Sequence, residues 1–348
     1  MQQAISHSNK RIEWQYKFNN KQMNPNILTS KSRVDGCKFL KNHTFKNGST
    51  VPLYELSTMG AFNQLIGHTK FDNRSYGNVY YRGAGGLYDN VLPALMRNRA
   101  NGSPDDLNRI LTSVCKDQYF RNSLKLKDTI TPIASQDFYK NKQITRYNKY
   151  CVEALLQHYA GSTRFLDVVD NHWVALWMGL HKFHTQGKGN KYCNFNKRQI
   201  SIGDIYESMI NNKNGIANSD IYVYVLLIAM PYSDKMPVLG IIETDEFVEV
   251  DLRKALPSFY LRPHAQHALV IRKRDKGNIN KVASYYDMSS QVIGILSIRI
   301  DRAAEWLGEG TLLSCENLFP SPSIDQGYNN LLMHPDIFVH PFEIRKYF

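Results

Sequence analysis

The chain has 348 residues, of which 43% are apolar and 12% aromatic, and its Lys and Arg residues outnumber Asp and Glu by 12. This content predicts a globular protein of one large or two smaller domains, and the sequence lacks the window of 18 apolar residues that would indicate a transmembrane helix. The positive charge favours anionic partners, such as a nucleotide, nucleic acid or an acidic protein. Because the first residues lack the apolar stretch of a signal peptide, we expect a cytoplasmic protein with no membrane partner.

Residues 1–50 are rich in Asn, Lys, Ser and Gln. This composition predicts a loosely structured lead-in or accessory segment, followed by a single domain over residues 51–348. The domain is predicted to open with a helix that ends near Gly67, because apolar residues recur there at helical spacing: Leu53, Leu56, Met59, Phe62 and Ile66.

A strand is predicted over residues 78–82, followed by a glycine turn and a short helix around 91–98, whose Pro93 suits a first turn. Farther along, a helix with a stop at Gly161 and a second, largely apolar helix over 173–183 are predicted. The apolar face of the first of these helices is formed by Val152, Leu155, Leu156 and Tyr159.

Residues 186–219 are rich in Asn, Lys and Gly and predict an exposed loop. Four β-branched or aromatic runs follow and predict strands: "DIYVYVLLIAM", "EFVEVDL", "HALVIRK" and "VIGILSIRI". A helix over 301–307 and another that begins at Ser323 or Asp325 complete the chain. Helices early and strands late predict an α+β fold with an antiparallel or mixed sheet.

The glycine cluster in "YYRGAGG" resembles the start of a dinucleotide-binding loop, with Gly83 and Gly85 after a strand. The third glycine of that fingerprint is absent because position 88 is Tyr, and no phosphate-binding GK[ST] follows. The glycines alone therefore indicate a strand-to-helix turn. Arg82 at the strand end is suited to bidentate contacts with a phosphate, and the alternative is a surface ion pair.

The stretch "QHYAGSTRFLD" gathers polar side chains between two apolar helices: Gln157, His158, Ser162, Thr163, Arg164 and Asp167. Polar groups in such a corner either satisfy one another or line a cleft. Arg164 and Asp167 have the alternative of a structural ion pair that holds the turn.

The sequence indicates neither a metal-binding site nor a catalytic cysteine. His172, His181, His184 and Cys193 lack a second closely spaced pair of ligands, so no metal is expected. Cys151 and His158 are about 10 Å apart along a helix, which excludes a thiolate–imidazole pair. The five cysteines form no CxxC motif and indicate reduced thiols.

Near the last strands, Gln266 stands at the entry to an apolar run, where a polar side chain needs a partner or a ligand. The basic cluster of residues 272–274 is expected to be a solvated strand edge, because no aromatic platform accompanies it.

Three stretches together resemble the FRG domain: "YYRGAGGLYDNVLPALMR", "LLQHYAGSTRFLDVVDNHWVALWMGL" and "YLRPHAQHALVIRK". A weaker fourth match is "LFPSPSIDQGYNNL", so the resemblance spans about residues 78–330 of the predicted domain. Tyr81 replaces the Phe of the family motif, and His267 and Ala268 stand where the family has Gly after the Gln. The family pattern falls on Tyr81, Arg82, Gly83, Gln157, His158, Tyr159, Thr163, Arg164, Leu166, Asp167, Arg262 and Gln266.

The motif layout of the FRG domain is similar to that of ADP-ribosyltransferases. The resemblance therefore implies a fold of that type and NAD as a substrate. It implies the catalytic residues Arg82, Thr163, Gln266 and Asp167, and the cofactor-binding residues Tyr81, Arg82, Gly83, Gly85, His158, Tyr159 and Arg164.

The function that the resemblance implies is an intracellular NAD-utilising effector, either an ADP-ribosyltransferase or an NAD hydrolase, of the kind found in toxin or anti-phage systems. A protein acceptor is not identified by the sequence. Gln266 stands where a catalytic Glu is normal, so a non-catalytic protein that binds a nucleotide, nucleic acid or a nucleotide-derived signal is the alternative. A purely structural protein would use the same polar motifs as internal hydrogen-bond networks.

Overall fold

The computed structural model describes most of the chain from residue 24 onward. The described residues are 24–29, 34–97, 102–117, 141–159, 162–187, 192–199, 221–233, 238–276, 282–308, 313–333 and 344–347, with the single residues 201, 203, 206, 210 and 342. Of the segment expected as a lead-in, residues 1–23 lie outside this set. Within the described part, no helix is both long and apolar enough to cross a membrane.

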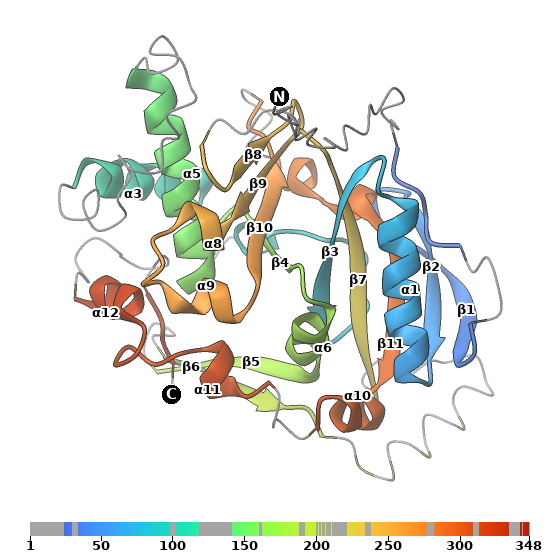
Figure 1. Ribbon diagram of the computed structural model, residues 1–348. Helices are drawn as coiled ribbons and strands as arrows, with labels where there is room; N and C mark the ends of the chain where they lie inside the picture. Colours follow the sequence, from blue (N-terminus) through green and yellow to red (C-terminus); the bar gives the residue numbers. More distant parts are fainter. Residues whose placement is uncertain are drawn as a thin grey trace, which may run out of the picture.

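A nine-stranded sheet forms the centre of the molecule (Figure 1), in the order β1-β2-β11-β7-β3-β4-β10-β9-β8. β11 pairs with β2 in parallel, whereas its other ladder, with β7, is antiparallel. The mixed sheet and its helices confirm the predicted α+β class. The strands are β1 (Cys37–Thr44), β2 (Thr50–Leu56), β3 (Gly77–Ala84), β4 (Leu166–Val169), β7 (Tyr222–Pro231), β8 (Ile241–Glu243), β9 (Phe247–Asp251), β10 (Ala268–Lys273) and β11 (Val292–Arg299).

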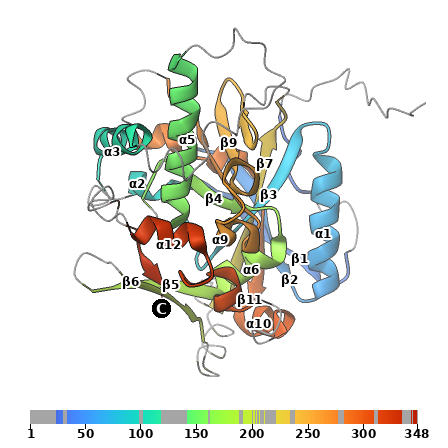
Figure 2. The same ribbon diagram turned by 60° about the vertical axis from the view of Figure 1, so that its left-hand side comes forward.

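Helices cover one face of this sheet in two groups (Figures 1 and 2). The two groups pack on two apolar clusters of the core. Val169 of β4 belongs to one cluster and Ala268 of β10 to the other, and because these residues are paired in the sheet, both clusters lie on the same face. The first group is α1 (Met59–Asp72), α6 (His172–Leu180) and α10 (Ile300–Trp306). The second is α3 (Pro104–Lys116), α5 (Asn141–Tyr159), α8 (Leu252–Ala255) and α12 (Gln326–Leu332).

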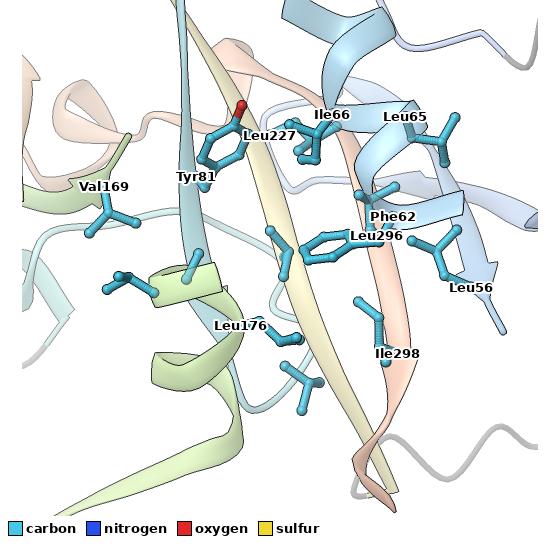
Figure 3. Close-up of a cluster of buried hydrophobic side chains, with 14 of the residues drawn as sticks. Leu56, Phe62, Leu65, Ile66, Tyr81, Val169, Leu176, Leu227, Leu296 and Ile298 are labelled. Carbon is cyan, nitrogen blue, oxygen red and sulfur yellow. The ribbon is translucent and has the colours of Figure 1, made fainter. Parts of the chain in front are cut away.

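The first helix group packs on the sheet through a dense apolar cluster (Figure 3). Phe62 of α1 and Ile298 of β11 are fully buried, as is Leu227 of β7. Burial of a large apolar side chain contributes about 1.5–3 kcal/mol. The cluster therefore fixes α1 and α6 against β3, which is the strand that carries Arg82.

The opposite face of the sheet holds a third apolar cluster, with Tyr80, Leu226 and Ile295 among its members. Loop residues such as Val91 and Met288 join this cluster. Two short helical turns lie beside this cluster, η6 (Ala283–Tyr286) and η7 (Ser289–Gln291). The short helix α2 (Ala94–Arg97) contacts η6. Two further short helices, α9 (Leu261–Ala265) and α11 (Cys315–Leu318), precede β10 and α12.

Several predicted boundaries agree with the structure. The four late apolar runs form β7, β9, β10 and β11, and the early strand forms β3. The helix predicted over 301–307 is α10, and the last predicted helix is α12, with Asp325 as its N-cap. Asp325 accepts a hydrogen bond from the Tyr328 amide at 2.9 Å, which fixes where α12 begins.

The helix predicted to include Leu53 and to end near Gly67 is wrong at both ends, since α1 continues to Asp72. Leu53 and Leu56 belong to β2, and α1 begins at Met59 because Thr58 caps it through the Ala61 amide at 3.1 Å. A three-residue spacing places two residues on one side of a helix but on opposite faces of a strand. Both faces of β2 are covered, since Leu53 lies in the apolar cluster opposite the helices and Leu56 in the cluster of α1.

Two other segments also differ from their prediction. The helix predicted over 173–183 ends at Leu180, where β5 (His181–Gln186) begins. β5 pairs with β6 (Tyr192–Lys197), which lies in the expected loop, and β6 pairs with β12 (Lys346–Tyr347). β1 likewise lies partly within residues expected to be loosely structured. β1 and β5 pair with their neighbours in sequence, β2 and β6, but most of their residues are exposed, so these strands lack the apolar runs on which the strand predictions depend.

The ladder between β3 and β4 consists of one residue pair, Tyr81 and Val169. β3 is paired along its whole length with β7 on its other side, so its edge toward β4 is open before and after Tyr81. One cavity lies at each of these two openings.

Candidate functional site

Arg82 lines a cavity of about 260 Å³ beyond the β3–β4 junction. The side chain is opposite Leu226 in the β3–β7 ladder, so it lies on the sheet face that carries the third apolar cluster. Leu166 of β4 and Ile295 of β11 form part of the floor. The rim contains a second guanidinium, that of Arg97 at the end of α2.

Neither arginine of this cavity has a carboxylate partner within ion-pair distance in the part of the chain that the structure describes. Arg82 Nη1 donates to the main-chain oxygen of Asp167 at 2.6 Å, and Arg97 Nε donates to that of Leu92 at 2.8 Å. Burial, followed by the charge of Arg97, lowers the pKa of Arg82 to about 10. Arg82 therefore stays protonated at neutral pH, and the cavity carries two positive charges.

The glycine loop forms the next wall of the cavity, through Gly83, Gly85 and Gly86. A Cβ on Gly83 would lie 1.8 Å from the Ala175 carbonyl oxygen, so this glycine lets α6 pack directly on the β3 backbone. Tyr88, which is 62% exposed, stands at the rim beside Gly86. Its ring is placed to cover a ligand in the cavity.

A chain of hydrogen bonds supports the cavity from behind. Thr163 Oγ1 donates to Gln157 Oε1 at 2.7 Å, and Gln157 Nε2 donates to Asp167 Oδ2 at 2.5 Å. The Phe165 amide donates to Thr163 Oγ1 at 3.0 Å. Burial raises the pKa of Asp167, which the nearby charge of Arg82 and the Gln157 hydrogen bond oppose. Thr163 is fully buried and Asp167 follows Leu166 of the cavity wall.

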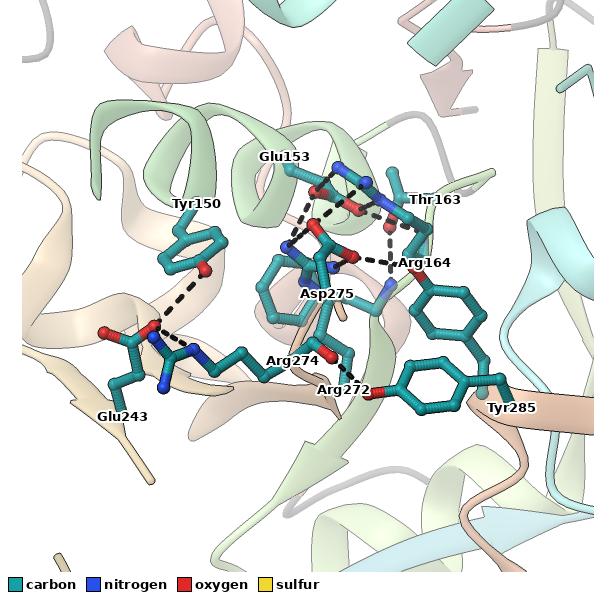
Figure 4. Close-up of polar contacts among 11 residues, drawn as sticks. Tyr150, Glu153, Thr163, Arg164, Glu243, Arg272, Arg274, Asp275 and Tyr285 are labelled. Atoms are coloured by element: carbon teal, nitrogen blue, oxygen red, sulfur yellow. Dashed lines mark hydrogen bonds and ion pairs between the residues drawn. The ribbon is translucent and has the colours of Figure 1, made fainter. Parts of the chain in front are cut away.

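Arg164 lies in a separate, buried ionic network (Figure 4). Its guanidinium pairs with Glu153 at 2.7 Å and with Asp275 at 3.3 Å. The ion pair with Asp167 that the sequence allowed does not form. Arg272 is fully buried beside Glu153 and Asp275, so the prediction of a solvated basic edge is wrong at this residue. Two guanidinia and two carboxylates balance one another inside the fold.

His158 and Tyr159 lie at the end of α5 in an aromatic cluster around Arg262. The Arg262 guanidinium carbon is 4.2 Å from the centre of the Tyr159 ring, and its Nη1 donates to the His158 carbonyl oxygen at 3.3 Å. Tyr159 donates to Asp325 at 2.8 Å. Burial and the charge of Arg262 lower the pKa of His158 to about 3. This cluster joins two of the family motifs to the last helix.

The structure does not gather all predicted site residues around one cavity. Gln266 is buried and donates to the Leu318 carbonyl oxygen at 2.7 Å. Tyr81 is fully buried on the opposite face of β3, beside His172. Of the predicted residues, Arg82, Gly83 and Gly85 line the 260 Å³ cavity, and Thr163 and Asp167 stand behind it.

Arg97 is a candidate site residue that sequence reasoning missed. It falls at the end of the helix predicted around residues 91–98, outside the motif residues. Fifteen positions separate it from Arg82, and only the turn after β3 brings the two guanidinia to one cavity. Among the described residues, no group of three or more His, Cys, Asp or Glu side chains is arranged to hold a metal ion.

Comparison with protein families supports the resemblance over part of the chain. Residues 77–187 match the family model of the FRG domain. The match includes β3, the glycine loop, the Gln157–Asp167 stretch and α6, whereas Arg262 and Gln266 lie outside it. No curated protein matches the chain, and no solved structure matches it. Similarity of the fold to ADP-ribosyltransferases therefore stays a prediction.

Proposed function

We propose that the cavity of Arg82 and Arg97 binds a phosphate-bearing nucleotide. The observation that carries this proposal is the pair of guanidinia, neither in a described ion pair, that share one concave site beside a glycine loop. Two like charges in a partly buried site repel each other, and a phosphate or pyrophosphate removes that cost. Glycines let a ligand approach the backbone closely. Tyr88 supplies an aromatic surface for a base or a nicotinamide ring.

Titration calorimetry with ADP, AMP and adenosine tests this proposal on the full chain. We expect affinity to rise with the number of phosphates and to fall with added salt, because both arginines act through charge. The variant Arg97→Gln should lose about tenfold or more of the ADP affinity, since a hydrogen bond to a charged group is worth about 1.5–3 kcal/mol. Arg109→Gln, an exposed arginine away from the cavity, is the charge-matched control. Equal affinity for adenosine and ADP would contradict the proposal.

The second candidate is cleavage of NAD at its nicotinamide bond. Asp167 favours it, because its main-chain oxygen accepts a hydrogen bond from Arg82 at 2.6 Å and the charge of Arg82 acts on its carboxyl group. A carboxylate stabilises the positive charge that develops on the ribose during such a cleavage. Burial raises the pKa of Asp167, so ionisation would depend on a bound ligand or on Arg82.

Release of nicotinamide from NAD, followed by chromatography, separates the two candidates. Turnover that disappears in Asp167→Asn while NAD binding persists would support the enzyme. Tight binding without any release above that of Arg82→Ala would leave a nucleotide-binding protein. Where nicotinamide is released, an acceptor of ADP-ribose would be identified by the transfer of label from labelled NAD.

A further inference from the structure

A second cavity, of about 430 Å³, lies on the other side of the β3–β4 junction. It opens between the first half of β3 and the β10–β9 pair, and α1 and α8 close its sides. This volume is within the usual range of small-molecule sites. Its charged or polar lining side chains are Lys70, Arg74, Asn78, Tyr80, Asp170, Tyr232, Glu249, Asp251, Arg253 and Lys254.

Glu249 is a buried carboxyl group that lines this cavity, with 5% of the residue exposed. Its Oε1 accepts a hydrogen bond from Tyr80 at 2.5 Å. No described residue forms an ion pair with Glu249, and none donates to its Oε2. Oε2 is also not among the enclosed, unpartnered atoms of the described residues. It is therefore free to accept a hydrogen bond from a ligand in the cavity.

The other carboxylates of the cavity are already paired. Arg253 lies 2.7 Å from Asp170 and 2.9 Å from Asp251, and Lys254 lies 3.3 Å from Asp251. Lys70, in contrast, has no ion pair in the described part of the chain, and its Nζ stands 5.3 Å from the centre of the Tyr81 ring. Among the lining groups, the Glu249 carboxyl group and the Lys70 ammonium group thus have no ion pair in the described part of the chain, and the Arg74 guanidinium donates only to the Phe71 carbonyl oxygen at 2.6 Å.

We propose that this cavity binds a small zwitterion, with its protonated amine at Glu249 and its carboxylate at Lys70. A simple anion would lie against the Glu249 carboxyl, and a simple cation would leave Lys70 unpaired. A ligand that carries both an amine and a carboxylate can pair with Glu249 and with Lys70 at the same time. The hydrogen bond from Tyr80 holds the Glu249 side chain in position for this contact. The site is separate from the nucleotide cavity and does not depend on it.

The binding should depend on pH through Glu249. Burial raises the pKa of Glu249 to about 7, while the Tyr80 hydrogen bond and Lys254 oppose the rise and Asp251 adds to it. The other charged and titratable groups around the cavity are Lys70 of α1, Arg74 after α1, Asp170 after β4, Tyr232 after β7, Arg253 of α8 and His267 before β10. An ammonium group binds the ionised carboxylate, so affinity should fall as the pH drops below 7.

Calorimetry with ω-amino acids from glycine to 6-aminohexanoate tests this site. The matched single-charge probes are pentylamine and valerate, which carry only one end of 5-aminovalerate. We expect at least one zwitterion to bind about tenfold or more tightly than either probe, because each probe lacks one of the two charged contacts. Affinity should be about tenfold weaker near pH 6 than near pH 8. Glu249→Gln should weaken binding and remove this pH dependence, which separates Glu249 from His267.

Folding of each variant is checked by its melting temperature. Lys70→Gln should lose affinity for the carboxylate end, whereas Lys38→Gln on β1 is the charge-matched control. Binding of valerate as tight as that of 5-aminovalerate would overturn the proposal in favour of a plain anion site. Absence of binding by every ω-amino acid, or unchanged binding in folded Glu249→Gln, would also overturn it.

Discussion

Glu153 Oε2 lies 2.7 Å from Arg164 Nη2, and the two side chains are 0% and 5% exposed. The same oxygen is 3.8 Å from Arg272 Nη2, so one buried carboxylate faces two guanidinia. Glu153 belongs to α5, and Arg272 to β10. Arg164 begins the turn that leads into β4 and Asp167. The network therefore determines where the family's middle motif enters the sheet.

Glu153→Gln is predicted to lower the free energy of unfolding by about 3–5 kcal/mol, because it leaves buried guanidinia without their charge partner. Urea denaturation followed by tryptophan fluorescence measures this change. Asp301→Asn breaks a more exposed pair with Arg299 and should cost less than about 1 kcal/mol. A similar small loss in both variants would show that the network contributes little.

Gly83→Ala is predicted to destabilise the fold by about 1–3 kcal/mol or more, because the added methyl group meets the Ala175 backbone. The matched control is Gly67→Ala in α1, where no atom lies within 4 Å of the added Cβ. That variant should gain about 0.5–1 kcal/mol from helix propensity. Thermal unfolding of the two variants should thus shift in opposite directions, and a stable Gly83→Ala would contradict the close contact between α6 and β3.

The sequence predicts elements well where local pattern and burial agree. The run that forms β7 is rich in aromatic, β-branched and other apolar residues, and nine of its ten residues are buried, which is typical of a central strand. The face of α5 is equally clear, since Val152, Leu155 and Leu156 are fully buried. Leu53 and Leu56 were ambiguous because their three-residue spacing fits a helix, whereas both are buried in β2 by its pairing with β11.

The candidate site could be predicted only in part. Arg82 and the glycine loop are contiguous in sequence, so their shared cavity follows from one strand end and one turn. The partner of Arg164 could not be found this way, because Glu153 lies within a helix whose polar residues look solvated by pattern alone. Gln266 was expected to need a partner, and the carbonyl oxygen of Leu318, at the end of α11, supplies one. Such contacts depend on tertiary packing.

Stability is predicted to fall in acid partly through His158. Its pKa is lowered by burial to about 3 in the fold and is about 6.5 in the unfolded chain. The unfolded state therefore binds the extra proton first, and stability is lost as the pH falls below 6.5. The loss from this group is about 2 kcal/mol between pH 6.5 and pH 5, at about 1.4 kcal/mol per pH unit.

His158→Phe tests this assignment, because phenylalanine retains the ring contact with Tyr159 and does not titrate. Denaturant unfolding of both proteins between about pH 5 and pH 8 isolates the contribution of His158 as the difference between the two curves. The variant should show the shallower loss in acid. Parallel curves would mean that the pKa of His158 is the same in the folded and the unfolded state.

Thr163 is predicted to act as a support for the cavity, since its hydroxyl is fully buried between Gln157 and the Phe165 amide. Thr163→Val removes both hydrogen bonds at nearly constant volume and should cost about 1–3 kcal/mol of stability. Thr163→Ser keeps the hydroxyl and should lose only about 1 kcal/mol for the missing methyl group. ADP affinity should change less than about threefold in both variants, because Thr163 does not line the cavity. The opposite result is that folded Thr163→Val loses most of its ADP affinity or nicotinamide release while Thr163→Ser retains both. The hydroxyl would then contact the ligand, as the resemblance to ADP-ribosyltransferases implies.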